Sequence, residues 1–223
     1  MGRTEAMNIV DEFIEYLKKN KNIEAYTFFQ EVPVKVKAEV LDIDEIRKQI
    51  ELKVNEKFVF AIADEKEVYF NFKNEVLVSS AVYWDKDIVV IFFPKIALEP
   101  KTKRKTVRVK VSSKNPIKME LFFDENDSVC VFLNDISEDG VGFMVSHDIE
   151  QKLHIGKTYK AKLFLNGEYD ILIEIRYLYK LKDDIYTVGA KIVEAPKNLP
   201  DKIAKYVAER QKEIIKLINE IKG

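Results

Sequence analysis

Apolar and polar positions alternate along most of this chain, and the alternation predicts a mainly β protein. From residue 31 onward, Val32, Val34 and Val36 are each separated by one Pro or Lys, as in a strand that is buried on one face. Further strand-like runs, separated by short polar turns, are predicted at 57–63, 67–72, 76–84 and 87–93. Between Ile43 and Ile50 the spacing also allows a short helical interruption.

Two segments have helical spacing instead. Residues 5–19 carry one apolar face opposite charged residues, which predicts an amphipathic first helix. A second helix is predicted from about Pro200 to the end of the chain, and its apolar seam resembles a short heptad repeat. The seam consists of Ile203, Val207, Arg210, Ile214, Leu217 and Ile221. It packs either on its own domain or on a second copy of the chain as a homodimer, and Arg210 within it favours the first alternative.

A change of composition divides the chain into two halves. Residues 94–100 contain two prolines, and residues 101–110 contain six Lys or Arg and no acidic residue, which is typical of an interdomain linker. A second series of strands is predicted beyond it, at 106–112, 117–123, 129–134, 141–146, 158–165, 168–178 and 185–193.

The arrangement of these predicted strands favours one fold class. A parallel sheet needs crossover helices between its strands, and the pattern contains none between residues 57 and 195. Short strands with turns every 8–12 residues are typical of antiparallel barrels or sandwiches. We therefore predict two antiparallel β-barrels with an N-terminal and a C-terminal helix, in domains at residues 1–98 and 99–223.

Composition excludes several classes of protein. The chain has 223 residues, of which 47% are hydrophobic and 34% charged, and its net charge of −1 gives no bulk attraction to nucleic acid. Its longest apolar run, residues 88–93, is far shorter than the roughly 20 residues that cross a bilayer. The first twenty residues contain no signal-peptide core. We expect no membrane span and a cytoplasmic location.

Candidate catalytic and metal-binding groups are sparse. The two histidines, His147 and His154, have no neighbouring cysteines and form no metal-binding motif, so we expect both at the surface. The single cysteine, Cys130, excludes an internal disulfide, and its apolar neighbours predict a buried thiol. No glycine-rich phosphate loop is present. We predict no catalytic residue, no metal site and no enzymatic activity.

Two polar segments carry chemistry suited to an anionic ligand. The cationic run contains Lys103, Arg104 and Arg108, and guanidinium groups both grip phosphate oxygens and stack on nucleobases. Residues 134–140 contain Asp135, Ser137 and Gly140 in a polar turn between predicted strands. Taken singly, the first is also typical of a solvated linker and the second of an ordinary turn.

Together the two segments form a more specific pattern. Arg104-x-x-x-Arg108, followed about 27 residues later by Asp135-x-Ser137-x-x-Gly140, resembles the signature of the PilZ domain family, RxxxR then [DN]xSxxG. The resemblance covers about residues 101–200. The strand rhythm of the N-terminal half resembles the split barrel that precedes PilZ in flagellar-brake (YcgR-type) proteins. The fold implied is an N-terminal split barrel followed by a PilZ barrel.

The resemblance implies that cyclic di-GMP is the ligand and that no cofactor is needed. Carried over by position, Arg104 and Arg108 would contact phosphate and stack on guanine. Asp135 would accept hydrogen bonds from guanine N–H donors. Ser137 would add a hydroxyl contact or hold the turn, and Gly140 would let the backbone turn tightly and approach the ligand.

Two positions depart from the family pattern. Lys103 stands where many members have a second arginine, and it would reach a phosphate but stack poorly. This position helps to set whether one ligand or a stacked pair is bound. Asp139 stands where many members have a second glycine, and it would add negative charge beside an anionic ligand. Both changes bear on affinity and stoichiometry.

The position of the arginines on a linker implies a mechanism of regulation. Ligand binding would order the linker and change the arrangement of the two domains, which would present a new surface to a protein partner. A flagellar motor or polysaccharide synthase component would be a partner of the expected kind.

Two other functions are kept as alternatives. A degenerate PilZ-fold scaffold would bind only protein, for example through the C-terminal helix, and would not respond to cyclic di-GMP. A barrel that binds single-stranded nucleic acid would use the cationic linker and aromatic residues such as Phe122, Phe123 and Tyr177. Alternating strand aromatics belong more often to a core, which disfavours this second alternative.

Overall fold

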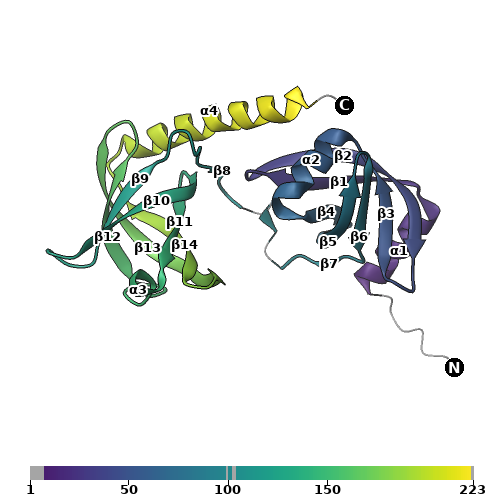
Figure 1. Cartoon of the computed structure of the whole chain (residues 1–223), viewed down its shortest axis with the longest axis horizontal. Coiled ribbons are helices and arrows are strands. Elements are labelled where there is room, and N and C mark those ends of the chain that lie inside the picture. Colours follow the sequence, from purple (N-terminus) through teal and green to yellow (C-terminus); the bar gives the residue numbers. More distant parts are fainter. Residues whose placement is uncertain (1–7, 99, 102–103, 222–223) are drawn as a thin grey trace. The chain divides into compact units, whose positions relative to one another are not determined.

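The chain divides into two compact units (Figure 1). The computed structural model describes residues 8–98, 100–101 and 104–221. The first unit comprises residues 1–104 together with 214–223, and the second comprises residues 105–213. The domain boundary that we expect between residues 98 and 99 stays a prediction.

The first unit is an antiparallel barrel. In the described residues the strands pair in the order β4-β1-β2-β3-β6-β5, the β4–β5 pairing closes six of them into a barrel, and β7 adds to β5. This confirms the predicted N-terminal barrel. Its elements are α1 (Ile9–Lys19), β1 (Asn22–Phe29), β2 (Val32–Asp44), β3 (Gln49–Lys53), α2 (Glu56–Glu65), β4 (Glu67–Phe72), β5 (Glu75–Asp85), β6 (Ile88–Phe92) and β7 (Lys95–Ile96).

Helix α1 buries its apolar face in the core of this barrel. The Asn8 side chain begins the helix by accepting hydrogen bonds from the backbone N–H groups of Val10 and Asp11, at 2.9 and 3.0 Å. Phe13 is fully buried, and its ring centroid lies 5.1 Å from that of Phe70 on β4. The predicted first helix is therefore confirmed.

One predicted strand of the first unit is wrong. Residues 57–63 form most of helix α2, because the Asn55 side chain accepts a hydrogen bond from the Phe58 N–H at 2.9 Å and caps the helix. Phe58, Ala61 and Ile62 are fully buried. Ala61 and Ile62 come three and four residues after Phe58, so all three lie on one face of the helix. The residues Phe58-Val59-Phe60 are all apolar, so they fit both the two-residue period of a strand and the 3.6-residue period of a helix. Alternation could therefore not distinguish a strand from a helix there.

The pattern also missed strand β1 and allowed a helix that does not form. Four consecutive residues of β1, 25–28, are buried, so the strand shows no alternation in sequence. The segment from Ile43 to Ile50 is the end of β2, a turn and the start of β3. Ile43 and Ile50 are cross-strand partners, which explains why both are apolar.

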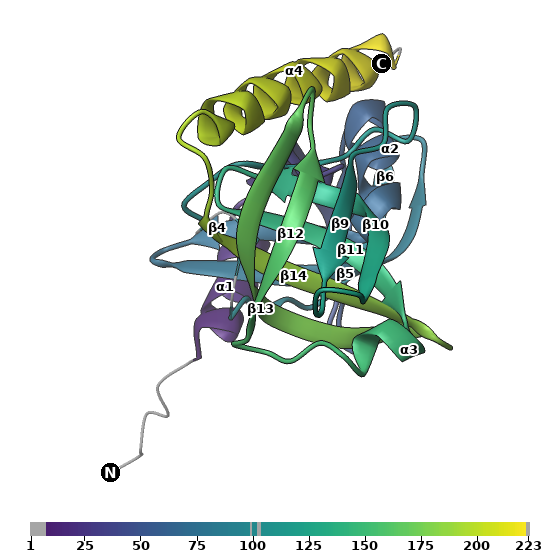
Figure 2. The ribbon, with the colours of Figure 1, turned by 90° about the vertical axis from the view of Figure 1, so that its left-hand side faces the viewer.

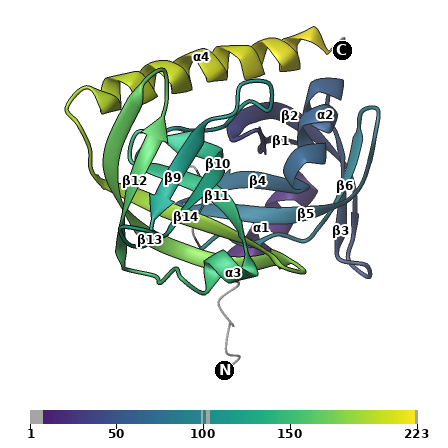
Figure 3. The ribbon, with the colours of Figure 1, turned by 60° about the vertical axis from the view of Figure 1, so that its left-hand side comes forward.

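The second unit is also an antiparallel barrel (Figures 2 and 3). Among its described residues, six strands close in the order β11-β14-β13-β12-β9-β10 through the β10–β11 pairing, and β8 adds to β10. Seven strands lie where the sequence predicts them, and the mainly β fold class is confirmed. The elements are β8 (Arg108–Lys110), β9 (Lys118–Phe122), β10 (Ser128–Ser137), β11 (Gly140–Ser146), α3 (His147–Glu150), β12 (Thr158–Phe164), β13 (Glu168–Lys182) and β14 (Ile185–Glu194).

The prediction of a buried thiol is wrong. Cys130 is exposed on β10, because side chains alternate along the strand and its neighbours Val131 and Leu133 point into the barrel. Consecutive apolar residues in a strand point to opposite faces, so only some of them are buried.

Helix α4 (Leu199–Glu220) confirms the predicted C-terminal helix. Within the second unit, Ile203 and Val207 are buried as the seam predicts. Arg210 of the seam is held by β8, since its Nε donates to the Lys110 carbonyl oxygen at 3.0 Å. Further along, Leu217 is exposed and Ile218 is buried in its place. The seam therefore follows the 3.6-residue period of an ordinary helix, and the predicted position Leu217 is wrong.

Candidate functional site

The edge formed by β8, β10 and β11 brings four predicted site residues together. Arg108 on β8 is the register partner of Ser137 on β10, and Ser137 is in turn the partner of Gly140 on β11. Cross-strand partners lie on the same face of a sheet, about 5 Å apart. The Arg108 guanidinium also contacts the Asp135 carboxylate, with Nη1 and Oδ1 3.2 Å apart. We call this surface, carrying Arg108, Asp135, Ser137 and Gly140, the motif face.

The motif face lies on the outside of the barrel because of an irregularity in β10. Val131 and Leu133 point inward, but the next inward residue is Ile136, which is fully buried. The pairing of β10 with β11 shifts between Leu133 and Asp135, and this bulge changes the alternation by one position. Asp135 would otherwise face the core. The bulge therefore directs the carboxylate outward, beside Arg108.

The turn after β10 is held by hydroxyl groups. Ser137 is buried, and its Oγ donates to Asp139 Oδ1 at 2.9 Å. Thr106 Oγ1 donates to the same oxygen at 2.5 Å. Burial acts to raise the pKa of the Asp139 carboxyl, but these hydrogen bonds and the charge of Arg108 outweigh it and lower the pKa. Asp139 is therefore a negative group at neutral pH, and Ser137 holds the shape of the turn.

Two glycines make room on this face. A Cβ on Gly140 would lie 2.9 Å from the Ala190 carbonyl oxygen, so glycine is needed here for close strand approach. Gly142 is the register partner of Asp135, and a Cβ there would lie 2.3 Å from Asp135 Oδ2. Sequence reasoning missed Gly142, because the predicted strand began at residue 141 and left Gly140 in the preceding turn. In the structure both glycines lie on β11, two residues apart and therefore on one face.

The other two predicted residues are not part of this cluster. Lys103 lies outside the described residues. Arg104 belongs to the first unit, where its Nη1 pairs with the Glu31 carboxylate. Lys101 contacts the same carboxylate at 2.9 Å and also pairs with Glu65. The structure therefore places the two arginines of RxxxR beside two different carboxylates.

The carboxylates around Lys101 have pKa values that move in opposite directions. Burial acts to raise the pKa of Glu31, but the charges of Lys101 and Arg104 outweigh it and lower the pKa. Burial raises the pKa of Glu65, and Lys101 offsets only part of that effect. The Lys101 ammonium also lies over the Phe28 ring, 5.2 Å from its centroid. Nothing in the local sequence around Glu31 indicated its link to Arg104.

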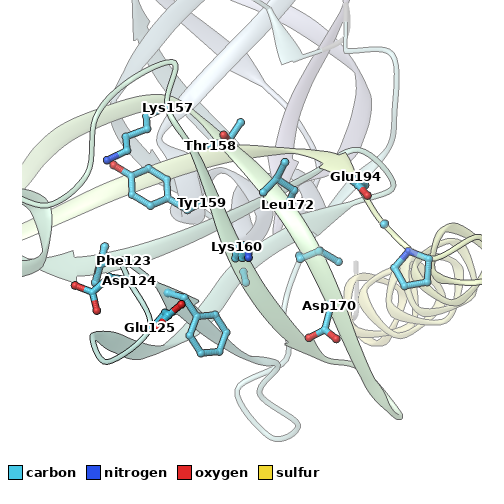
Figure 4. A pocket seen from close by; sticks show the side chains of 15 residues that line it. Phe123, Asp124, Glu125, Lys157, Thr158, Tyr159, Lys160, Asp170, Leu172 and Glu194 are labelled. Atoms are coloured by element: carbon cyan, nitrogen blue, oxygen red, sulfur yellow. The ribbon is translucent and has the colours of Figure 1, made fainter.

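A groove of about 970 Å³ lies elsewhere on the second barrel (Figure 4). Phe122, Phe123, Tyr159 and Leu172 give it apolar surface, and carboxylates outnumber lysines around them. Within the described part of the chain, no residue of the motif face lines this groove. Its charged lining residues are Asp124, Glu125, Asp170, Glu194, Lys157 and Lys160. Its acidic character does not suit a phosphate ligand, so the motif face is the better candidate site.

The described residues contain no group of three or more His, Cys, Asp or Glu side chains that could hold a metal ion. His147 is exposed, pairs with Glu150 at 3.3 Å and stacks on Tyr186. His154 is also exposed, so both histidines lie at the surface as predicted. Among the helices of the described residues, none is long and apolar enough to cross a membrane.

Comparisons with known proteins support the fold. No protein-family model matches the chain. It is 26% identical over 226 residues to an uncharacterised protein of Aquifex aeolicus (strain VF5), covering 95% of this chain and 97% of that one. Among solved structures it is similar to the MrkH–c-di-GMP complex of K. pneumonia, with a TM-score of 0.52, 14% identity and coverage of 93% and 94%.

The chain is also similar to YcgR from Escherichia coli in complex with c-di-GMP, with a TM-score of 0.49 and 10% identity. The match covers 96% of this chain and 94% of that one. The similarity to MrkH extends over both units and shows a shared fold. The resemblance predicted from the sequence is therefore confirmed at the level of fold.

Proposed function

We propose that this chain is a PilZ-type receptor for cyclic di-GMP and that the ligand binds on the motif face. The observation that carries the proposal is the convergence of Arg108, Asp135, Ser137 and Gly140 on one outer surface of the second barrel. These residues are separated by up to 32 positions in sequence, yet β8, β10 and β11 place them next to one another.

The chemistry of these groups suits a guanine dinucleotide. Arg108 presents planar N–H donors that match phosphate oxygens and can stack on a base. Asp135, when ionised, only accepts hydrogen bonds, so it complements the N–H edge of guanine. Gly142 keeps the backbone free of a side chain beside that carboxylate, and Gly140 does the same beside Ser137. Arg104 and Lys103 would add contacts to phosphate.

The output of binding would be regulation of a protein partner. Residues 101–110 lie at the start of the domain proposed at 99–223, next to the end of the domain proposed at 1–98, and carry both arginines. A ligand that draws this segment onto the motif face would favour one arrangement of the domains, to the extent that it binds that arrangement more tightly. We infer that the partner recognises this arrangement, and that the protein acts as a receptor without catalytic activity.

Calorimetric titration of cyclic di-GMP into the full chain tests the proposal. Saturable binding should occur in the wild type and fall at least ~100-fold in Asp135→Ala, because the guanine edge loses its acceptor and Arg108 loses its partner. Asp127→Ala is a matched control, since Asp127 is an aspartate of the same unit that lies outside the motif face and pairs with Lys152 at 2.6 Å. If the folded wild type does not bind cyclic di-GMP, the receptor hypothesis is wrong, and the alternative of a PilZ-fold scaffold that binds only protein takes its place.

A further inference from the structure

A single row of paired residues crosses the outer face of the second barrel from the motif face onward. Asp135 on β10 is the partner of Gly142 on β11, Gly142 is the partner of Gly189 on β14, and Gly189 is the partner of Tyr177 on β13. Figure 3 shows β11, β14 and β13 following one another across this barrel. Two adjacent glycines thus separate a carboxylate from an aromatic ring.

Both side chains at the ends of the row lie over the glycines. A Cβ on Gly142 would lie 2.3 Å from Asp135 Oδ2. A Cβ on Gly189 would lie 2.1 Å from ring carbons Cε1 and Cζ of Tyr177. Since neighbouring strands are about 4.8 Å apart, the carboxylate and the ring come within roughly one strand spacing of each other. Any side chain at Gly142 or Gly189 would displace one of them.

The aromatic end of the row is open to solvent. Tyr177 is 37% exposed and Tyr179 is 56% exposed, and their rings stack with centroids 5.8 Å apart. An exposed pair of stacked rings beside a hydrogen-bond acceptor can contact both the face and the edge of a flat heterocycle. A purine base with N–H donors on its edge has this combination of surfaces.

We propose that Tyr177 is a ligand-contacting residue whose ring stacks on the guanine base that Asp135 binds by its N–H edge. This inference rests on the proposed function and adds a residue to the site that neither RxxxR nor [DN]xSxxG contains. It also assigns roles to Gly142 and Gly189: they provide the side-chain-free surface on which the acceptor and the ring come together.

The inference predicts how substitutions of Tyr177 affect affinity. Stacking of a base on an aromatic side chain contributes enough that Tyr177→Ala should weaken cyclic di-GMP binding about 5- to 100-fold. Tyr177→Phe keeps the ring and should stay within about twofold of the wild type. Tyr177→Leu keeps an apolar cover over Gly189 but no ring, so it should resemble the alanine variant. Phe132→Ala, which removes an exposed ring elsewhere on β10, is the control.

A fluorescent reporter gives a second, direct measurement. The only tryptophan of the chain, Trp84, lies in the first unit on β5. In Tyr177→Trp, stacking of guanine should quench the emission of the new tryptophan as cyclic di-GMP is added, whereas Phe132→Trp should show no such change.

The outcomes separate this inference from the proposed function. Wild-type affinity in Tyr177→Ala and Tyr177→Leu, with binding still lost in Asp135→Ala, would overturn the role of Tyr177 and leave the receptor intact. An absence of binding in the folded wild type would overturn both. Loss of affinity in the alanine and leucine variants but not in Tyr177→Phe, together with quenching in Tyr177→Trp, is the result that supports the contact.

Discussion

The two arginines of the RxxxR pattern are chemically identical but lie in different settings. Arg104 is more exposed and pairs with Glu31 in the first unit, whereas Arg108 is mostly buried and pairs with Asp135 in the second. Asp135 is itself a predicted ligand contact, so its pair with Arg108 orients a binding group. Glu31 is not, so its pair with Arg104 competes with any anion that approaches. The motif identifies both arginines as candidate ligand contacts. The carboxylate beside each arginine determines how much that arginine contributes to ligand binding.

Glu31 is well suited to act as such a competitor. Its side chain is only 12% exposed, and its lowered pKa keeps it ionised at neutral pH. A phosphate that binds Arg104 must therefore share it with, or take it from, a fixed carboxylate. We expect Arg108 to anchor the ligand and Arg104 to adjust the affinity.

The largest expected effect is a difference between the two arginine variants. Arg108→Ala should reduce cyclic di-GMP affinity at least ~100-fold, because it removes a phosphate contact and leaves Asp135 without its cation. Arg104→Ala should reduce it only about 5- to 20-fold, since binding through Arg104 first breaks a pair. Calorimetry of both variants measures the difference, and equal losses would remove the distinction between the two arginines.

The next effect concerns the stability of the first unit. Lys101 lies between Glu31 and Glu65, and all three side chains are less than a fifth exposed. Lys101→Ala should lower the free energy of unfolding by about 2–4 kcal/mol, because two buried carboxylates lose their shared cation. Lys35→Ala is the control, since its pair with Glu24 is exposed and contributes little. Urea denaturation of both variants tests this, and a similar small change in each would contradict it.

A smaller change of opposite sign is expected when the competitor is removed. Glu31→Gln should raise affinity for cyclic di-GMP about 3- to 10-fold, because Arg104 no longer has to leave a carboxylate. The gain should disappear in the double variant with Arg104→Ala. Glu24→Gln, an exposed glutamate on β1, provides the control by calorimetry. Unchanged or weaker binding in Glu31→Gln would show that the pair does not compete with the ligand.

The smallest effect is a pair of opposed pH dependences of stability. The folded pKa of Glu31 lies below its usual 4.5, so its stabilisation is complete above pH 4.5 and is lost as pH falls through the lowered value. The folded pKa of Glu65 is raised, so its contribution becomes less favourable as pH rises from 4.5 through the raised value. Measured by denaturation across pH, Glu31→Gln should flatten the loss of stability in acid, and Glu65→Gln should steepen it. The same slope in both variants would contradict this assignment.

Alternation in the sequence predicted the second barrel well because its strands are long and half-buried. It failed at α2, where Phe58-Val59-Phe60 fits both periods, and at β1, where consecutive residues are buried on both faces.

The candidate site was predictable only in part. Arg108, Asp135, Ser137 and Gly140 follow from a local pattern. By contrast, the bulge that turns Asp135 outward, the link from Arg104 to Glu31 and the ring of Tyr177 over Gly189 all depend on pairing between distant segments. Such contacts leave no periodic signal in a single chain.

Backbone amide NMR of the full chain, recorded with and without cyclic di-GMP, tests the central claim most directly because it reports where the ligand binds. The claim predicts that the largest shifts fall on Gly140, Gly142 and Gly189, on the motif face and the row beside it. Shifts that gather instead at Asp124 and Asp170 of the separate groove, or spectra that do not change at saturating ligand, would contradict it.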